Sequence, residues 1–370
     1  MTRPIALFAL ALGALAGCGG DDGAGNSLPA APTAQQLFVV RPLGPGGPML
    51  GYEMPAARER FRLPAGLASA DGADFYAAHT HTRRTHIVSY DTRSGIPKRS
   101  FDVRGRWKLA GVSPTGEWLA FAWTARGKTT VRVVEAATGA VANRLTLPGN
   151  FEVEAVSADG SAMFLVQHLA HGAYKIRLYD LRHQKLAPGS LRAKGSDEIM
   201  AGYAWGGTAT PDGQWLLTLY LSTRRDTAFV HTLNLVNRFA LCLDLPSGIG
   251  DVAKLKAYGT ALSPDGAKLY AANPALGVVA ELDLVRGPMI RTVGTFEPVR
   301  SAERTQVVVS QDGRAVYFAN GRAVWRHDVA SGAVTRVYAN GTPIAGLGLS
   351  RDGDRLFLAP SDGRPLSIAA

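Results

Sequence analysis

Cysteine is almost missing from this chain of 370 residues, which holds only Cys18 and Cys242. Cys18 ends an N-terminal segment whose features predict its removal up to that residue. Cys242 would then be alone in the folded part, so an intramolecular disulfide is excluded as a source of stability. Because Cys242 lies in the apolar stretch of residues 239–245, we expect a buried and unreactive thiol.

A hydrophobic run long enough to cross a membrane is lacking at the N-terminus. The apolar run of residues 5–15 has eleven residues, whereas a spanning helix needs about 20. Arg3 precedes this run, and small residues lead from it to the tetrad Leu15-Ala-Gly-Cys18. The pattern predicts an export signal over residues 1–18 rather than a membrane helix.

The tetrad that ends at Cys18 resembles a bacterial lipobox. The resemblance implies that the signal is cut just before Cys18 and that its sulfur is acylated. The protein would then be lipid-anchored on the extracytoplasmic face of a cell membrane; an ordinary secretory signal with an incidental cysteine is the alternative. Residues 19–35 are rich in Gly, Pro and small polar residues, so they predict a flexible tether before one folded domain at residues 36–370.

Familiar catalytic motifs are missing too. The chain has no Gly-x-Ser-x-Gly elbow, no His-Glu-x-x-His pair and no Gly-x-x-x-x-Gly-Lys-Ser/Thr phosphate loop. No catalytic residue and no cofactor can therefore be assigned, and a binding protein is favoured over an enzyme.

What the chain does contain is a repeated turn of the form Ser/Thr-x-Asp/Thr-Gly, followed each time by a hydrophobic strand. The turns begin 40 to 53 residues apart. Self-similarity at about 40–50 residues is typical of propellers and solenoids. The seven turns start at Ser69, Ser113, Ser157, Thr210, Ser263, Ser310 and Ser350.

Residues 108–160 show the repeating unit. Two apolar strands, an alternating third strand and a more polar fourth strand follow one another, separated by Gly-containing turns. Four such strands in about 44 residues make one propeller blade. We therefore predict an all-β, seven-bladed β-propeller of four-stranded antiparallel blades, with six or eight blades as alternatives. Residues 37–40 and 58–63 would join the last blade as outer strands and close the ring.

The turn Ser263-Pro-Asp-Gly266, followed by Leu269-Tyr-Ala-Ala-Asn273, resembles the YVTN-type propeller repeats of bacterial surface proteins. It is also similar to the TolB-type and lactonase-type propellers. The resemblance covers residues 36–370 and implies the propeller fold, with ligands bound on the face opposite these turns. A narrower likeness, over residues 202–246, is to propeller proteins of high-GC Gram-positive bacteria.

Positive charge exceeds negative charge by ten. In an extracytoplasmic protein, this favours an anionic phospholipid or wall polymer over nucleic acid as a partner. Cations recur on one rim, in the turns between second and third strands, and a ring of like charge attracts anions. The alternative is that Lys and Arg are simply frequent in polar turns. The rim residues are Arg83, Arg84, Arg126, Lys128, Lys175, Arg224, Arg225, Arg322 and Arg364.

Three histidines, His79, His81 and His86, form a second candidate site. His-x-His on a strand places two imidazoles on one face, and a facing strand could add the third, so the set could bind zinc. Two neighbouring arginines argue against a cation, and no carboxylate completes the set. We therefore predict exposed hairpin histidines and no metal, with the same interpretation for His168 and His171.

A link of unusual length supplies a third candidate. Insertions on a binding face often carry function, and Glu198, Tyr203 and Trp205 could meet a ligand near the channel mouth. An ordered loop with two aromatic anchors is the alternative. His231 lies in an apolar strand, where we expect a packed and hydrogen-bonded core residue.

Three hypotheses for function remain. The first is a non-catalytic binding or scaffold module for an anionic envelope ligand or a protein partner. The second is an enzyme of the lactonase or quinoprotein type, with Glu198, His79 and Arg83 at the channel mouth. The third is a structural partner in an envelope complex.

Overall fold

The computed structural model describes residues 36–41, 46–191, 200–222, 226–247, 252–300, 303–339 and 341–370. The chain divides into two compact units, Met1–Ala34 and Gln35–Ala370, and all described residues belong to the second. The predicted signal, the tether and Cys18 lie outside the described residues. No helix in the described ranges is long and apolar enough to cross a membrane.

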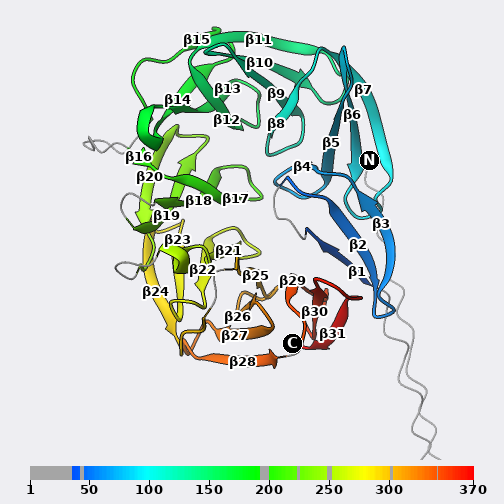
Figure 1. Cartoon of the computed structure of the whole chain (residues 1–370), viewed down its shortest axis with the longest axis vertical. Coiled ribbons are helices and arrows are strands. Elements are labelled where there is room, and N and C mark those ends of the chain that lie inside the picture. Colours follow the sequence, from blue (N-terminus) through cyan, green and yellow to red (C-terminus); the bar gives the residue numbers. More distant parts are fainter. Residues whose placement is uncertain are drawn as a thin grey trace, which may run out of the picture. The chain divides into compact units, whose positions relative to one another are not determined.

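The described residues of the second unit form eight antiparallel β-sheets that follow one another around a ring (Figure 1). Within each sheet the first strand lies toward the middle of the ring and the last strand lies at its outside (Figure 1). The two terminal sheets have three strands each. They are β1 (Gln36–Val40), β2 (Met49–Met54) and β3 (Arg58–Leu63), and β29 (Ile344–Leu349), β30 (Arg355–Pro360) and β31 (Leu366–Ala369).

Six sheets with four strands along the main path lie between these two. The second and third sheets are β4 (Gly66–Ala68), β5 (Asp74–Thr80), β6 (Arg84–Asp91) and β7 (Pro97–Arg104), then β8 (Lys108–Val112), β9 (Trp118–Ala125), β10 (Lys128–Glu135) and β11 (Val141–Pro148). The fourth and fifth are β12 (Asn150–Val156), β13 (Ala162–His168), β14 (Ala173–Asp180) and β15 (Lys185–Leu186), then β17 (Tyr203–Ala209), β18 (Trp215–Ser222), β19 (Thr227–Asn234) and β20 (Phe239–Asp244). The sixth and seventh are β21 (Gly259–Leu262), β22 (Lys268–Asn273), β23 (Val278–Asp283) and β24 (Met289–Thr295), then β25 (Gln306–Val309), β26 (Ala315–Asn320), β27 (Ala323–Asp328) and β28 (Val334–Ala339). The short strand β16 (Met200–Ala201) also pairs with β14, and the described helical segments are α1 (Val252–Leu255) and a 3-10 turn, Ala170–Gly172.

The prediction of an all-β propeller with antiparallel blades is confirmed, but the predicted blade number and closure are wrong. Residues 37–40 and 58–63 lie in β1 and β3, which pair with β2 and not with the last sheet. These three strands form an eighth blade. Counting turns misses this blade because no Ser/Thr-x-Asp/Thr-Gly turn occurs in its sequence.

Packing of the first sheet against the last closes the ring. Phe38 and Val40 of β1 share a buried cluster with Phe357 of β30, and the Phe38 and Phe357 ring centroids are 5.7 Å apart. Two glycines of β29 allow this approach. A Cβ atom would lie 1.9 Å from the Val40 side chain at Gly346, and 2.7 Å from the Phe38 ring at Gly348. Side-chain packing therefore replaces the expected shared sheet.

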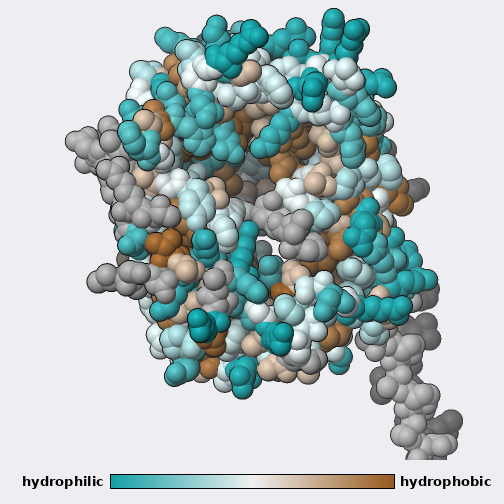
Figure 2. Space-filling view, viewed as in Figure 1, coloured by the Kyte–Doolittle hydropathy of each residue, from teal (hydrophilic) through white to brown (hydrophobic). Residues whose placement is uncertain are grey.

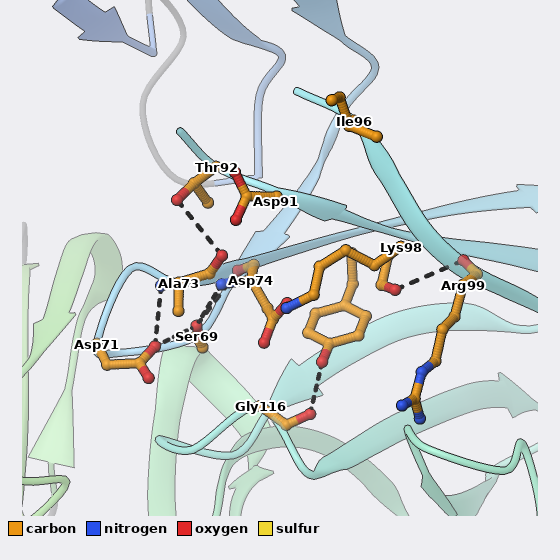
Figure 3. A network of polar contacts seen from close by, with 12 residues as sticks. Ser69, Asp71, Ala73, Asp74, Asp91, Thr92, Ile96, Lys98, Arg99 and Gly116 are labelled. Carbon is orange, nitrogen blue, oxygen red and sulfur yellow. Dashed lines mark hydrogen bonds and ion pairs between the residues drawn. The ribbon is translucent and has the colours of Figure 1, made fainter. Parts of the chain in front are cut away.

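The repeated turns are held by the same contacts. In the first, Ser69 Oγ donates to Asp71 Oδ1 at 2.5 Å and accepts the backbone N–H of Asp74 at 3.0 Å (Figure 3). Gly72 adopts a φ of 69°, which favours glycine, and its N–H donates to the Ser69 carbonyl. Five other turns have both side-chain contacts, and in the second turn Thr115 replaces the aspartate. The conspicuous Asp and Gly residues thus serve the turns.

The antiparallel strands divide the connections of the ring between two faces. The Ser/Thr-x-Asp/Thr-Gly turns and the third-to-fourth turns lie on one face, which we call the turn face. The second-to-third turns and the links between sheets lie on the other, which we call the link face.

Candidate functional site

The predicted basic rim lies on the link face, in or beside the turns between second and third strands. Its described members are exposed: Arg83, Arg84, Arg126, Lys128, Lys175, Arg322 and Arg364. Arg84 Nη1 donates to Asp102 Oδ2 at 2.9 Å, so its charge is paired. Arg224 and Arg225 lie outside the described residues.

The rim cations do not converge on the cavities at the middle of the ring. Arg322 lines a separate cavity of about 920 Å³ together with Arg300 and Arg336. The other six described rim residues do not line the three cavities next to the ring axis. The rim is therefore a set of dispersed charges on separate sheets.

One histidine of the second sheet, His86, contacts a carboxylate. His79 and His86 face each other on β5 and β6, while His81 follows β5 and is exposed. His86 Nδ1 lies 2.9 Å from Asp102 Oδ1, and its hydrogen bond holds the pKa of Asp102 below its usual range. Asp102 therefore pairs with one of the three histidines. In the part of the chain that the structure describes, no group of three or more His, Cys, Asp or Glu is arranged to hold a metal ion.

The exposure of Cys242 differs from the prediction of a buried thiol. Its side chain is exposed rather than buried. It lies in β20, the outermost strand of its sheet. His231, by contrast, is fully buried and hydrogen-bonded as expected, with Nδ1 3.2 Å from Glu154 Oε1.

The long-link candidate is only partly described. Glu198 lies outside the described residues. Tyr203 and Trp205 lie on β17 with ring centroids 6.3 Å apart, and Tyr203 is exposed. Trp205 Nε1 donates to the Lys256 carbonyl at 3.1 Å, which fixes its indole. Of the two aromatic residues, Trp205 lines the cavities next to the axis.

The middle of the ring is hollow, as Figure 2 shows on one face. A cavity of about 650 Å³, which we call the central cavity, is lined by residues of the inner strands β4, β8, β12 and β17. An adjoining cavity of about 990 Å³ is lined by residues of β1, β21, β25 and β29. Arg41, Arg304 and Trp205 line both. These three side chains therefore mark the boundary between two hollows on the axis.

β-Bulges direct side chains of the inner strands into these hollows. The registers of β8, β12, β17 and β29 each skip one residue against the second strand of the sheet. The skipped residues are Ala110, Glu154, Trp205 and Ala345, and each lines a cavity next to the axis. A bulge re-aims the extra residue, and two of the four extra residues, Glu154 and Trp205, have a charged or an aromatic side chain.

Arg41 follows β1 and lines the central cavity. Its Cζ lies 5.2 Å from the centroid of the Phe75 ring, which is within cation–π range. Burial lowers the pKa of its guanidinium. Among the described residues, Arg41 has no ion pair with a carboxylate.

Arg304 reaches the same cavity from the link that precedes β25. Its guanidinium packs on the backbone of Gly206, where a Cβ atom would lie 2.0 Å from Nη2. Burial lowers the pKa of Arg304 as well. Within the described ranges it too lacks an ion pair, so neither guanidinium of the central cavity is in contact with a carboxylate.

An acidic wall faces the same cavity. Glu152 and Glu154 of β12 both line it. Glu152 is exposed, and its Oε2 lies 3.3 Å from His168 Nε2. His171 lies in the turn after His168 and has a φ of 61°. The Glu154 side chain is 6% exposed, and its Oε2 has no hydrogen-bond partner among the described residues.

Two aromatic residues support the buried Glu154–His231 pair. Tyr220 stacks on Tyr174 with centroids 5.0 Å apart and meets the His231 ring edge-on at 5.9 Å. Burial raises the pKa of both tyrosines beyond the range in which they ionise at ordinary pH. Tyr220 also lines the central cavity, so this cluster connects the cavity to the interior of the next sheet.

Sequence reasoning missed Arg41, Arg304, Glu152 and Glu154. Arg41 and Arg304 lie beside the segments of residues 42–45 and 301–302, outside any repeated motif. The one available signal was the pattern Phe-Glu-Val-Glu in residues 151–154, where charge occupies the slot of an inner strand. Such a slot in a propeller faces the axis, so repeated carboxylates there indicate a polar channel.

Comparison with known proteins shows the fold alone. No protein-family model matches the chain, and no curated protein matches it. Among solved structures, the Dos1 propeller is similar with 11% identity, a TM-score of 0.52, and 88% of each chain covered. The dihydro-heme d1 dehydrogenase NirN is similar with 16% identity and a TM-score of 0.51, over 90% of this chain and 73% of that one. A putative 6-phosphogluconolactonase from Bacteroides fragilis has 17% identity, covers 80% and 90%, and has a TM-score of 0.43.

Proposed function

We propose that this protein is a lipid-anchored, extracytoplasmic β-propeller of the YVTN-like kind that binds an anionic ligand in its central cavity. The observation that carries the proposal is the pair of partly buried cations, Arg41 and Arg304, which line one cavity and have no ion pair among the described residues. The predicted anchor at Cys18 would hold the cavity next to the membrane surface.

The energetics favour an external anion. A buried charge is costly unless it is paired and hydrogen-bonded, and a guanidinium presents five donors in a fixed geometry that matches carboxylate and phosphate. An anion between Arg41 and Arg304 would accept charge-assisted hydrogen bonds, each contributing about 1.5–3 kcal/mol. The ligand would thus supply the ion-pair partner that both arginines lack.

The exposed rim is a weaker candidate for the binding site. Its charges are exposed and dispersed, and exposed ion pairs contribute about 0–1 kcal/mol and are screened by salt. The rim could still speed the approach of an anion to the link face by long-range attraction. We therefore assign the affinity for the anion to the central cavity, and any acceleration of its approach to the rim.

The test is a titration with monoethyl phosphate and with butanoate, followed by calorimetry at low and physiological salt. Arg41→Gln combined with Arg304→Gln should abolish binding. The matched control is Arg83→Gln with Arg126→Gln and Arg364→Gln, which removes more charge from the rim and should leave affinity within about twofold. Loss of binding in the rim variant alone would reject the cavity and favour the rim.

An enzyme is the second candidate, because Glu154, which is hydrogen-bonded to the buried His231, lines one cavity with the two arginines. A carboxylate–histidine pair can act as a general base, and a guanidinium can stabilise a developing oxyanion. The previously suggested centre is not supported, since Glu198 lies outside the described residues and no contact joins His79 to Arg83. Hydrolysis of a sugar-acid lactone that is lost in Glu154→Gln, at unchanged stability, would favour the enzyme.

A further inference from the structure

The wall opposite the two arginines has a defined chemistry of its own. Glu154 occupies the bulge of β12 and lines the same cavity of about 650 Å³ as Arg41 and Arg304. Glu152, two residues earlier, lines it too. One small cavity therefore contains groups of both signs, contributed by strands and links from different sheets.

Glu154 is the most informative of these groups, because its side chain is 6% exposed and only one of its two carboxylate oxygens has a hydrogen-bond partner. Its Oε1 meets His231 Nδ1 at 3.2 Å, but its Oε2 has no hydrogen-bond partner among the described residues. A buried carboxylate oxygen without a donor is unfavourable. A donor from the ligand would satisfy it, and a positively charged donor would do so best.

The surroundings of Glu154 suit an ammonium group. An ammonium offers three donors and no acceptor, so it can bind Glu154 and Glu152 together. A second anionic group of the ligand would instead be repelled by the carboxylates of Glu152 and Glu154.

We infer that the ligand of the central cavity is a small amphoteric molecule, with a carboxylate or phosphate bound by Arg41 and Arg304 and an ammonium bound by Glu154 and Glu152. This inference rests on the proposed function, because the arginines hold the anionic end. The cavity volume lies in the range of small-molecule sites, about 300–1,000 Å³. A repeating polyanion is disfavoured, since its neighbouring charges would meet the carboxylates.

Two matched pairs of probes test the inference. Phosphoethanolamine differs from monoethyl phosphate by its ammonium group alone, and 4-aminobutanoate differs in the same way from butanoate. For wild-type protein, the ammonium should strengthen binding by about tenfold in at least one pair, the effect of one charge-assisted hydrogen bond. The pair that shows the effect identifies the anionic end as phosphate or carboxylate. Vesicles of phosphatidylethanolamine, compared with free phosphoethanolamine, then distinguish a lipid headgroup from a soluble ligand.

Isosteric variants assign the effect to its residues. Glu154→Gln should reduce the ammonium preference, the ratio of the two affinities within a probe pair, to less than about threefold. Glu152→Gln, at an exposed position, gives a second variant if Glu154→Gln folds poorly. Glu117→Gln, on the turn face, removes one exposed negative charge outside the cavity and should keep the full preference.

The outcomes separate the two proposals. Equal binding within each pair, still abolished by Arg41→Gln with Arg304→Gln, would overturn the amphoteric ligand and leave the anion site standing. An ammonium preference that survives in both glutamate variants would also overturn it. Absence of arginine-dependent binding for every probe would overturn the proposed function and this inference together.

Discussion

The guanidinium of Arg304 rests on the backbone of Gly206, close enough that a Cβ atom at residue 206 would lie 2.0 Å from Nη2. Gly206 directly follows Trp205, the residue that the bulge of β17 turns toward the axis. The bulge and the glycine together determine where one wall of the central cavity carries its positive charge. The position of Arg304 therefore depends on Gly206, a residue without a side chain.

Gly206→Ala should displace Arg304 and weaken anion binding by about tenfold, the equivalent of one charge-assisted hydrogen bond. The fold should persist, because the residue that must move is the end of a flexible side chain. Calorimetric titration with monoethyl phosphate measures the effect. Gly363→Ala, where the nearest atom is 3.6 Å away, is the matched control and should bind as wild type does. Unchanged affinity in Gly206→Ala would remove Arg304 from the site.

The eighth blade predicts a specific loss of stability. Phe38→Ala should lower the free energy of unfolding by about 3–5 kcal/mol, because Phe38 is 3% exposed and packs on Phe357 across the ring closure. Leu37→Ala, on the exposed side of the same strand, should change it by less than about 0.5 kcal/mol. Denaturant unfolding of both variants provides the comparison. Similar small losses in the two would argue that β1 does not close the ring.

The turn aspartates predict acid sensitivity. Burial acts to raise the pKa of Asp159, but the hydrogen bonds from Ser157 and Ser161 outweigh it and bring that pKa to about 2. Because the folded pKa lies below the ordinary value of 3.8, the carboxylate stabilises the fold above pH about 4 and loses this effect as pH falls toward 2. Asp159→Asn should therefore be less stable than wild type at pH 6, and the gap should close near pH 2. Glu117→Gln serves as the control; a gap that stays constant with pH would contradict the account.

The predicted lipobox gives a test in cells. Cys18→Ser should abolish acylation, so labelled palmitate should no longer be incorporated and the protein should leave the membrane fraction. Cys242→Ser is the matched control and should remain anchored, since its thiol lies in the folded unit. Membrane retention of the Cys18 variant would favour an ordinary export signal or another mode of attachment.

The repeated turns made most of the fold predictable, because Ser/Thr-x-Asp-Gly has the same hydrogen-bonding requirement wherever it occurs. The blade of β1, β2 and β3 was missed because its connections use other residues, so its strands looked like additions to the last blade. The sequence pattern singled out Trp205, yet Arg304, which lines the same cavities, lies 99 positions later in the chain. Only the closed ring brings such residues together, and the buried pairing of Glu154 with His231, 77 positions apart, has the same origin.

The most direct test of the central claim is a crystal structure of the protein grown with monoethyl phosphate. The account predicts phosphate oxygens about 3 Å from the guanidinium nitrogens of both Arg41 and Arg304 in the central cavity. A phosphate bound at Arg83, Arg126 or Arg364 on the rim, with the cavity free of ligand at saturating concentration, would contradict it.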